Sequence, residues 1–303
     1  MDFFYLIVGL IILVLGAEII IRGSVSLGKK LNISLFAIGV VIVAGGTSLP
    51  ELASSINAVI TNHADLALGA VVGSNIANLI LVMAATTIIF PITNINKNQI
   101  NQAWINIVLG IVLIFMSYFY FNFIFGIISI ILLTLIMFLQ ISKGSIIIDE
   151  VNKGDYSALI SIILIIIGVV FLIYGSELFV SSAINFANKF NVSEAVIGLS
   201  LIAFGTSLPE LVVGIISALK RKVDFALGNI LGSNIYNVLG VLGVVSFFDH
   251  FTMPNVLATQ DLIFMLLITF MILGFMYLSK KLGRTYGVIG LVLYFSYMYF
   301  IYI

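Results

Sequence analysis

Charged residues are scarce and cysteine is absent in this chain of 303 residues. Only 9% of the residues are charged and 62% are hydrophobic, whereas a soluble domain carries roughly 25% charged residues. We therefore expect most of the surface to face lipid. The absence of cysteine excludes disulfides, thiolate metal sites and cysteine nucleophiles. The net charge is zero and gives no indication of a nucleic-acid partner.

The amino-terminal segment lacks the basic residues that precede the apolar core of a signal peptide. The chain opens Met-Asp-Phe-Phe and then continues as an apolar run. A secretory signal needs a basic stretch before that run. Residues 3–21 are therefore predicted to form a retained transmembrane helix.

Ten apolar segments are long enough to cross a bilayer, which takes about 20 residues of helix. They are residues 3–21, 33–60, 66–90, 102–121, 123–141, 157–180, 192–219, 225–248, 259–279 and 285–302. The pattern predicts an all-α membrane protein with ten transmembrane helices. Gly, Pro, Ser, Thr and Asn interrupt the second, third, seventh and eighth segments, so these four helices are expected to be broken near the midplane.

An internal repeat relates the two halves of the chain. G-T-S-L-P-E-L occurs at 46–52 and 205–211, and G-S-N-I-x-N occurs at 73–78 and 232–237, both with an offset of 159 residues. Each copy holds five spans, an odd number, so the second copy should enter the membrane from the opposite side. We therefore expect a first repeat at 1–145, a short cytoplasmic linker at 146–156 and a second, inverted repeat at 157–303.

The basic residues indicate the orientation, because Lys and Arg collect in cytoplasmic loops. Twelve of the 13 Lys and Arg residues follow odd-numbered spans, and only Lys189 lies on the other side. The two copies also exchange their loop charges: residues 61–63 are Thr-Asn-His, and their counterparts at 220–222 are Lys-Arg-Lys. The distribution predicts a multi-pass protein of the cell (inner) membrane with both termini outside.

Glu51 and Glu210 lie deep inside apolar spans. A carboxylate there is costly and by default indicates an ion or proton pathway. Thr47 precedes Glu51 by four residues, and Thr206 precedes Glu210 by four, so each pair shares a helix face. Glu18 and Glu177 are different, because they lie nearer the ends of their spans and are expected to pair with loop cations or a neighbouring helix.

The second motif adds a hydroxyl and an amide on one helix face in each copy: Ser74 with Asn78, and Ser233 with Asn237. Pro50 and Pro209 carry no N–H, so the carbonyls of Gly46 and Gly205 lose their helical donors. Carboxylates, hydroxyls, amides and free carbonyls suit hard cations, and Ca²⁺ takes about six to eight oxygens in irregular geometry. The motifs therefore predict a cation site.

The two copies of G-T-S-L-P-E, each followed by G-S-N-I-x-N, resemble the alpha repeats of the cation/calcium exchanger superfamily. The compact prokaryotic form of the sodium/calcium exchanger family is the most similar branch, and the resemblance covers nearly the whole chain. It implies a secondary-active antiporter that exchanges Na⁺ for Ca²⁺ by alternating access, typically three sodium ions for one calcium ion.

The same resemblance implies roles for individual residues. Calcium would lie between Glu51 and Glu210 with help from Thr47 and Thr206. The sodium sites would use the same glutamates and four serines: Ser48, Ser74, Ser207 and Ser233. Backbone carbonyls would contribute at Ala44 and Ala203, and the central amides are those of Asn78 and Asn237. Several relatives carry aspartate where this chain has Asn237. This departure weakens a potassium-dependent interpretation and leaves the sodium stoichiometry and a proton role open.

Other classes of function make different demands on the sequence. A proton-coupled antiporter could use Glu51 and Glu210, but the G-N-x-x-E type of motif of that branch is absent. A channel favours a continuous polar pore, whereas this chain offers two compact motifs. An enzyme is not expected, because H-E-x-x-H is absent and neither His63 nor His250 lies within a span. We expect no cofactor, Ca²⁺ and Na⁺ as substrates, and an oligomeric state that the sequence leaves open, a monomer included.

Overall fold

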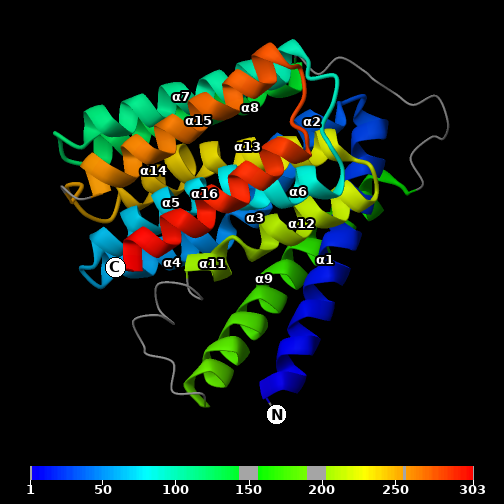
Figure 1. Cartoon of the computed structure of the whole chain (residues 1–303), viewed down its shortest axis with the longest axis horizontal. Coiled ribbons are helices and arrows are strands. Elements are labelled where there is room, and N and C mark those ends of the chain that lie inside the picture. The colour runs from blue at the N-terminus through cyan, green and yellow to red at the C-terminus, as the bar shows by residue number, and fades with distance from the viewer. Residues whose placement is uncertain (1, 143–155, 190–202, 255–256, 303) are drawn as a thin grey trace.

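A computed structural model describes residues 2–142, 156–189, 203–254 and 257–302 (Figure 1). Within these ranges the regular elements are helices, and strand-like pairing is limited to two isolated antiparallel bridges, Ile92 with Leu282 and Phe121 with Phe251. The prediction of an all-α protein is confirmed for this part of the chain.

The helices follow the order of the predicted spans. The first half contains α1 (Asp2–Leu31), α2 (Leu35–Ile38), the π-helical η1 (Gly39–Val43), α3 (Ala44–Thr47), α4 (Leu49–Ile60), α5 (Ala64–Ala77), the π-helical η2 (Asn78–Val82), α6 (Met83–Ile89), α7 (Lys97–Met116) and α8 (Phe123–Ser142). The second half contains α9 (Ala158–Lys189), α11 (Ala203–Thr206), α12 (Leu208–Leu219), α13 (Val223–Ile235), the π-helical η4 (Tyr236–Val241), α14 (Leu242–Val245), the π-helical η5 (Leu257–Asp261), α15 (Leu262–Leu278) and α16 (Arg284–Tyr302).

Seven helices of the described chain are long and apolar enough to cross a membrane. The count rises to eight if the bent pair Leu35–Thr47 and Leu49–Ile60 forms one span. The predicted seventh span falls partly on residues 190–202, which lie outside the described ranges. Its described part consists of the short helices α11 and α12, of 4 and 12 residues. The number of ten spans therefore stays a prediction.

Helix breaks occur at the two prolines but not in the third and eighth predicted spans. The helix axis bends by 41° between α3 and α4, and Ser207 interrupts the second copy between α11 and α12. The expectation of broken third and eighth helices is wrong, because Ala64–Ile89 and Val223–Val245 each continue as one helix. Neither segment contains proline, so no N–H is missing, and π-helical turns absorb the local irregularity instead.

Two other boundaries differ from the prediction. Helix α1 continues to Leu31 and α9 to Lys189, so Glu18 and Glu177 lie well inside their helices. Most of the predicted linker, residues 146–155, lies outside the described ranges. Its last residue, Tyr156, donates its backbone N–H to the hydroxyl of Ser26 at 3.1 Å.

Helices α1 and α9 form an antiparallel pair that extends away from the other helices (Figure 1). Glycines spaced seven residues apart let the two backbones approach closely. An added Cβ at Gly9 would lie 2.7 Å from the nitrogen of Phe179, and one at Gly16 would lie 2.9 Å from that of Leu172. Small residues at a helix crossing permit such contact within a membrane.

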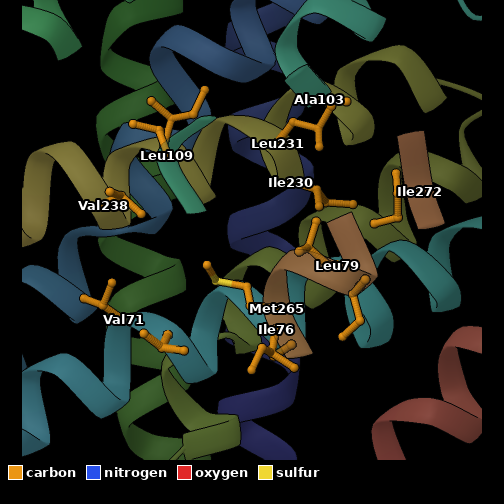
Figure 2. Close-up of a cluster of buried hydrophobic side chains, with 14 of the residues drawn as sticks. Val71, Ile76, Leu79, Ala103, Leu109, Ile230, Leu231, Val238, Met265 and Ile272 are labelled. Atoms are coloured by element: carbon orange, nitrogen blue, oxygen red, sulfur yellow. The ribbon is translucent and has the colours of Figure 1, made fainter. Parts of the chain in front are cut away.

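The main hydrophobic core surrounds α5 and α13, the helices that carry the second motif. Figure 2 shows Val71 and Ile76 of α5 with Ile230 and Leu231 of α13, and Met265 of α15 packs in the same cluster. These side chains are at most 4% exposed. Close packing of this kind fixes the motif helices relative to each other.

Candidate functional site

Glu51 and Glu210 lie in the first turns of α4 and α12, directly after the breaks at Ser48 and Ser207. Both side chains are completely buried. Each follows a proline at the start of its helix, where the missing N–H costs nothing, and the helix dipole favours a carboxylate there. By strict distance and angle criteria none of the four carboxylate oxygens has a hydrogen-bond partner in the described chain. Hydroxyls nevertheless lie beside them: that of Ser74 beside Glu51, and those of Thr47 and Ser233 beside Glu210.

Hydroxyl groups of the two copies meet in crossed pairs. The Oγ1 of Thr47 lies 3.4 Å from the Oγ of Ser233, and the Oγ of Ser74 lies 3.3 Å from the Oγ1 of Thr206. The offset of 159 residues converts one pair into the other. The first motif of each copy therefore contacts the second motif of the other copy, which brings these four predicted residues together.

The Oγ atoms of Ser48 and Ser207 are also buried, and neither has a hydrogen-bond partner in the described chain. Both residues lie at the helix breaks, three residues before the glutamates. They are available as oxygen ligands from the two motif loops.

The central amides form a second set of crossed pairs. Asn78 donates from Nδ2 to the Oδ1 of Asn234 at 3.0 Å, and Asn237 donates from Nδ2 to the Oδ1 of Asn75 at 3.0 Å. The same offset relates these two bonds. The Oδ1 atoms of Asn78 and Asn237 are buried and lack a hydrogen-bond partner among the described residues.

Three asparagines near the site were missed by the sequence analysis. Asn75 and Asn234 lie within the duplicated G-S-N-I-x-N motif, three residues before Asn78 and Asn237, so their helical spacing was an available signal. The third, Asn229, accepts a hydrogen bond from the Thr47 hydroxyl at 3.3 Å. Its counterpart in the first copy is Ala70, so the repeat offers no signal for it.

The predicted carbonyl ligands have mixed outcomes. The carbonyl of Ala44 accepts from the backbone N–H of Ser48 at 3.0 Å. It also lies 3.4 Å from the Thr47 hydroxyl, whose single proton it shares with the Oδ1 of Asn229. Ala203 begins α11, immediately after residues that the structure does not describe. Both roles as ion ligands stay predictions.

The carbonyl of Gly205, which lacks a donor from Pro209, is used by another helix. It accepts a hydrogen bond from the hydroxyl of Ser176 on α9 at 2.8 Å. The expectation that this oxygen is free is therefore wrong, because α9 lies close enough to supply a side-chain donor. The counterpart of Ser176 is Ala17 on α1, which has no hydroxyl.

Glu18 lies away from these motifs and has two cationic partners. Its carboxylate accepts from Arg22 on the same helix and from Lys220 at the end of α12. The prediction that Glu18 pairs with loop cations or a neighbouring helix is confirmed.

The arrangement is suited to hard cations. Glu51 and Glu210 supply four buried oxygens, Ser48 and Ser207 supply two hydroxyls, and the central amides supply two more oxygens, all without a hydrogen-bond partner in the described chain by the same criteria. Burying unpartnered carboxylates is unfavourable unless a positive charge compensates them. A cation that enters this site would supply that charge.

Comparison with known proteins gives a consistent result. The family model for the sodium/calcium exchanger protein matches residues 1–142 and 160–303. An uncharacterized membrane protein of Methanocaldococcus jannaschii is 35% identical over 96% of this chain and 94% of its own length. The sodium/calcium exchanger MaX1 of Methanosarcina acetivorans is 28% identical over 98% of this chain and 97% of its own length.

A solved structure of the sodium-calcium exchanger NCX_Mj, soaked with zero Na⁺ and Ca²⁺, superposes with a TM-score of 0.87. It is 33% identical in sequence and covers 97% of this chain and 96% of its own. The match of the family model over nearly the whole chain and the identity to full-length relatives agree with each other. The chain therefore belongs to the sodium/calcium exchanger family.

Proposed function

We propose that this protein is a secondary-active antiporter that exchanges Na⁺ for Ca²⁺ across a membrane by alternating access. The observation that carries the proposal is the pair of fully buried glutamates, Glu51 and Glu210, which have hydroxyls beside them but no cationic partner in the described chain. Their setting in a chain of the sodium/calcium exchanger family supports the choice of ions. The MaX1 relative carries the same activity in its name.

The ligands are suited to an ion that is transported rather than retained. Two ionised glutamates would balance one Ca²⁺, and the hydroxyl and amide oxygens would complete a shell of about six to eight ligands. Within the described ranges, no three His, Cys, Asp or Glu side chains gather as they would in a resident metal centre. We assign the ion ligands as Glu51 and Glu210 with the surrounding hydroxyls, amides and carbonyls: Thr47, Thr206, Ser48, Ser207, Ser74, Ser233, Asn78, Asn237, Ala44 and Ala203.

The proposal includes ten spans in two inverted repeats, with both termini outside. The crossed pairs support the repeat, because the contact of Thr47 with Ser233 and that of Ser74 with Thr206 exchange under the 159-residue offset. The 159-residue offset also relates contacts between α1 and α9 to one another. Gly9 approaches Phe179, and the offset converts this pair into Gly168 with Ile20, which also approach closely.

The contacts of the α1–α9 pair with the motif glycines, Gly46 and Gly205, are not related by the 159-residue offset. A Cβ added at Gly46 would meet Val169 at 2.6 Å, and one added at Gly205 would meet Val180 at 2.5 Å. Both contacts are with α9, whereas the offset would replace these valines by Leu10 and Ile21 of α1. The α1–α9 pair therefore occupies one of two positions that the offset relates. If the pair slid to the other position, the motif glycines of the two halves would exchange their surroundings. Alternating access needs two such states.

Flux measurements test this function. Purified protein in liposomes loaded with Na⁺ should take up radiocalcium when the outside sodium is removed. Proton and potassium gradients, imposed separately, should not replace the sodium gradient. Uptake that follows a proton gradient without sodium would show a proton-coupled antiporter, and uptake without any counter-ion would show a channel.

A further inference from the structure

We propose that Asn75 and Asn234 are positioning residues that hold the side-chain amides of Asn78 and Asn237 with their oxygens toward the transported cation. The inference rests on the proposed function and adds residues to its site. It starts from the two crossed hydrogen bonds, each 3.0 Å long, that join these four asparagines.

A backbone carbonyl determines the direction of one of these bonds. The carbonyl oxygen of Asn75 can only accept, and the Nδ2 of Asn234 lies 3.4 Å from it as the donor. The Oδ1 of Asn234 must then face the other way, where the Nδ2 of Asn78 donates to it. The oxygen and nitrogen of an amide are distinguished by such partners. The Oδ1 of Asn78 is consequently the atom that remains without a partner.

The second half uses the corresponding bond. Asn237 donates from Nδ2 to the Oδ1 of Asn75, which leaves the Oδ1 of Asn237 buried and unpartnered. Both asparagines with unpartnered oxygens are at most 1% exposed. Water therefore has little access to compete for these oxygens in the observed arrangement.

The central asparagines share a helix face with the hydroxyls that lie beside the glutamates. Asn78 is four residues after Ser74, which lies beside Glu51. Asn237 is four residues after Ser233, which lies beside Glu210. A flipped amide at either central position would present an NH₂ group to the cation, and its positive end would oppose binding. Fixing the amide direction therefore favours ion binding without adding charge.

Replacing the central asparagine by aspartate removes the need for a fixed direction, because both carboxylate atoms are oxygens. We therefore compare Asn75→Ala in the wild type with Asn75→Ala in an Asn237→Asp background. The probe is CaCl₂ alone, titrated against the melting temperature of the detergent-solubilised full chain, with NaCl as a second series. In the wild-type background the half-saturating calcium concentration should rise about tenfold, the effect expected when a cation loses one oriented dipole. In the Asn237→Asp background the rise should be less than about twofold.

Asn106→Ala is the matched control. Asn106 is a buried asparagine that joins α7 to α13, and it donates to the carbonyls of Gln102 at 2.9 Å and Leu231 at 3.2 Å, both outside the motifs. This variant should lower the melting temperature and leave the half-saturating calcium concentration unchanged in both backgrounds. If Asn75→Ala does not fold, Asn234→Ala compared with and without Asn78→Asp tests the same proposal on the other copy.

An equal loss of calcium affinity in both backgrounds would show that the role of Asn75 is structural and would overturn the inference. No loss of affinity in either background would also overturn it. Wild-type protein that binds neither ion would overturn the proposed function together with this inference. Wild-type binding without the predicted coupling would overturn only the positioning role.

Discussion

The ion pair between Glu18 and Lys220 should bias the exchange between the two transport states. It joins α1, one of the two sliding helices in our proposal, to the end of α12, the helix that begins beside Glu210. The offset maps Glu18 onto Glu177 and Lys220 onto Thr61. The equivalent contact after sliding would therefore place a glutamate near a threonine. The pair should stabilise the observed arrangement over the alternative one.

The structure bounds the size of this effect. The side chain of Lys220 is 32% exposed and that of Glu18 is 25% exposed. A partly exposed ion pair contributes about 0.5 to 1 kcal/mol, which corresponds to roughly a two- to fivefold change in the ratio of the two states. In Lys220→Thr the partner Arg22 remains bound to Glu18, so the loss should not exceed this range.

The assay is the half-saturating calcium concentration measured separately at the two faces of the membrane. A shift in the ratio of states makes the binding site more available on one face and less available on the other. Lys220→Thr should therefore change the two values in opposite directions, by about two- to fivefold. The control is Lys30→Thr, which removes a cation at the exposed end of α1. Values that stay unchanged, or that move in the same direction at both faces, would refute the reasoning.

Three further predictions concern topology, helix breaks and charge. Cysteines introduced at His63 and Arg221 should react with impermeant reagents from opposite sides of the membrane; labelling from the same side would contradict the inverted repeat. The double variant Pro50→Ala, Pro209→Ala should weaken calcium binding by about one hydrogen bond's worth of free energy, because regular helices would displace the glutamates. Unchanged affinity in calcium titrations would show that packing alone maintains the helix breaks. Exchange of three Na⁺ for one Ca²⁺ moves one net charge, so an inside-positive potential should accelerate calcium uptake into sodium-loaded liposomes, and potential-independent uptake would contradict this stoichiometry.

Much of the helical layout could be predicted from apolar segment length alone. The segment at 123–141 corresponds to α8, Phe123–Ser142, and the segment at 66–90 to the helix at Ala64–Ile89. The π-helical turns could not be predicted, because they depend on how tightly neighbouring helices pack. The length of α1 was underestimated because Arg22 ended the apolar run. Its guanidinium pairs with Glu18, so the helix continues to Leu31.

At the candidate site, the sequence predicted the charged residues but not their contacts with other helices. The duplicated motif singled out Glu51 and Glu210, since a carboxylate in an apolar span is informative by itself. The partners that cross between copies, such as Ser74 with Thr206, depend on tertiary packing and needed the structure. The use of the Gly205 carbonyl by Ser176 depends on the position of α9, which no local pattern encodes.

The most direct test of the account is sodium-driven radiocalcium flux in three glutamate variants, at matched protein levels in liposomes. Glu51→Gln and Glu210→Gln keep the side-chain shape but each remove a full negative charge from a completely buried site. At an effective dielectric constant near roughly 20, the attraction between Ca²⁺ and one carboxylate is about 14 kcal/mol at a contact distance of about 2.4 Å, so both variants should lose nearly all flux. Glu18→Gln, outside the site, should retain substantial flux. Robust flux in both Glu51→Gln and Glu210→Gln would contradict the assignment of the ion site.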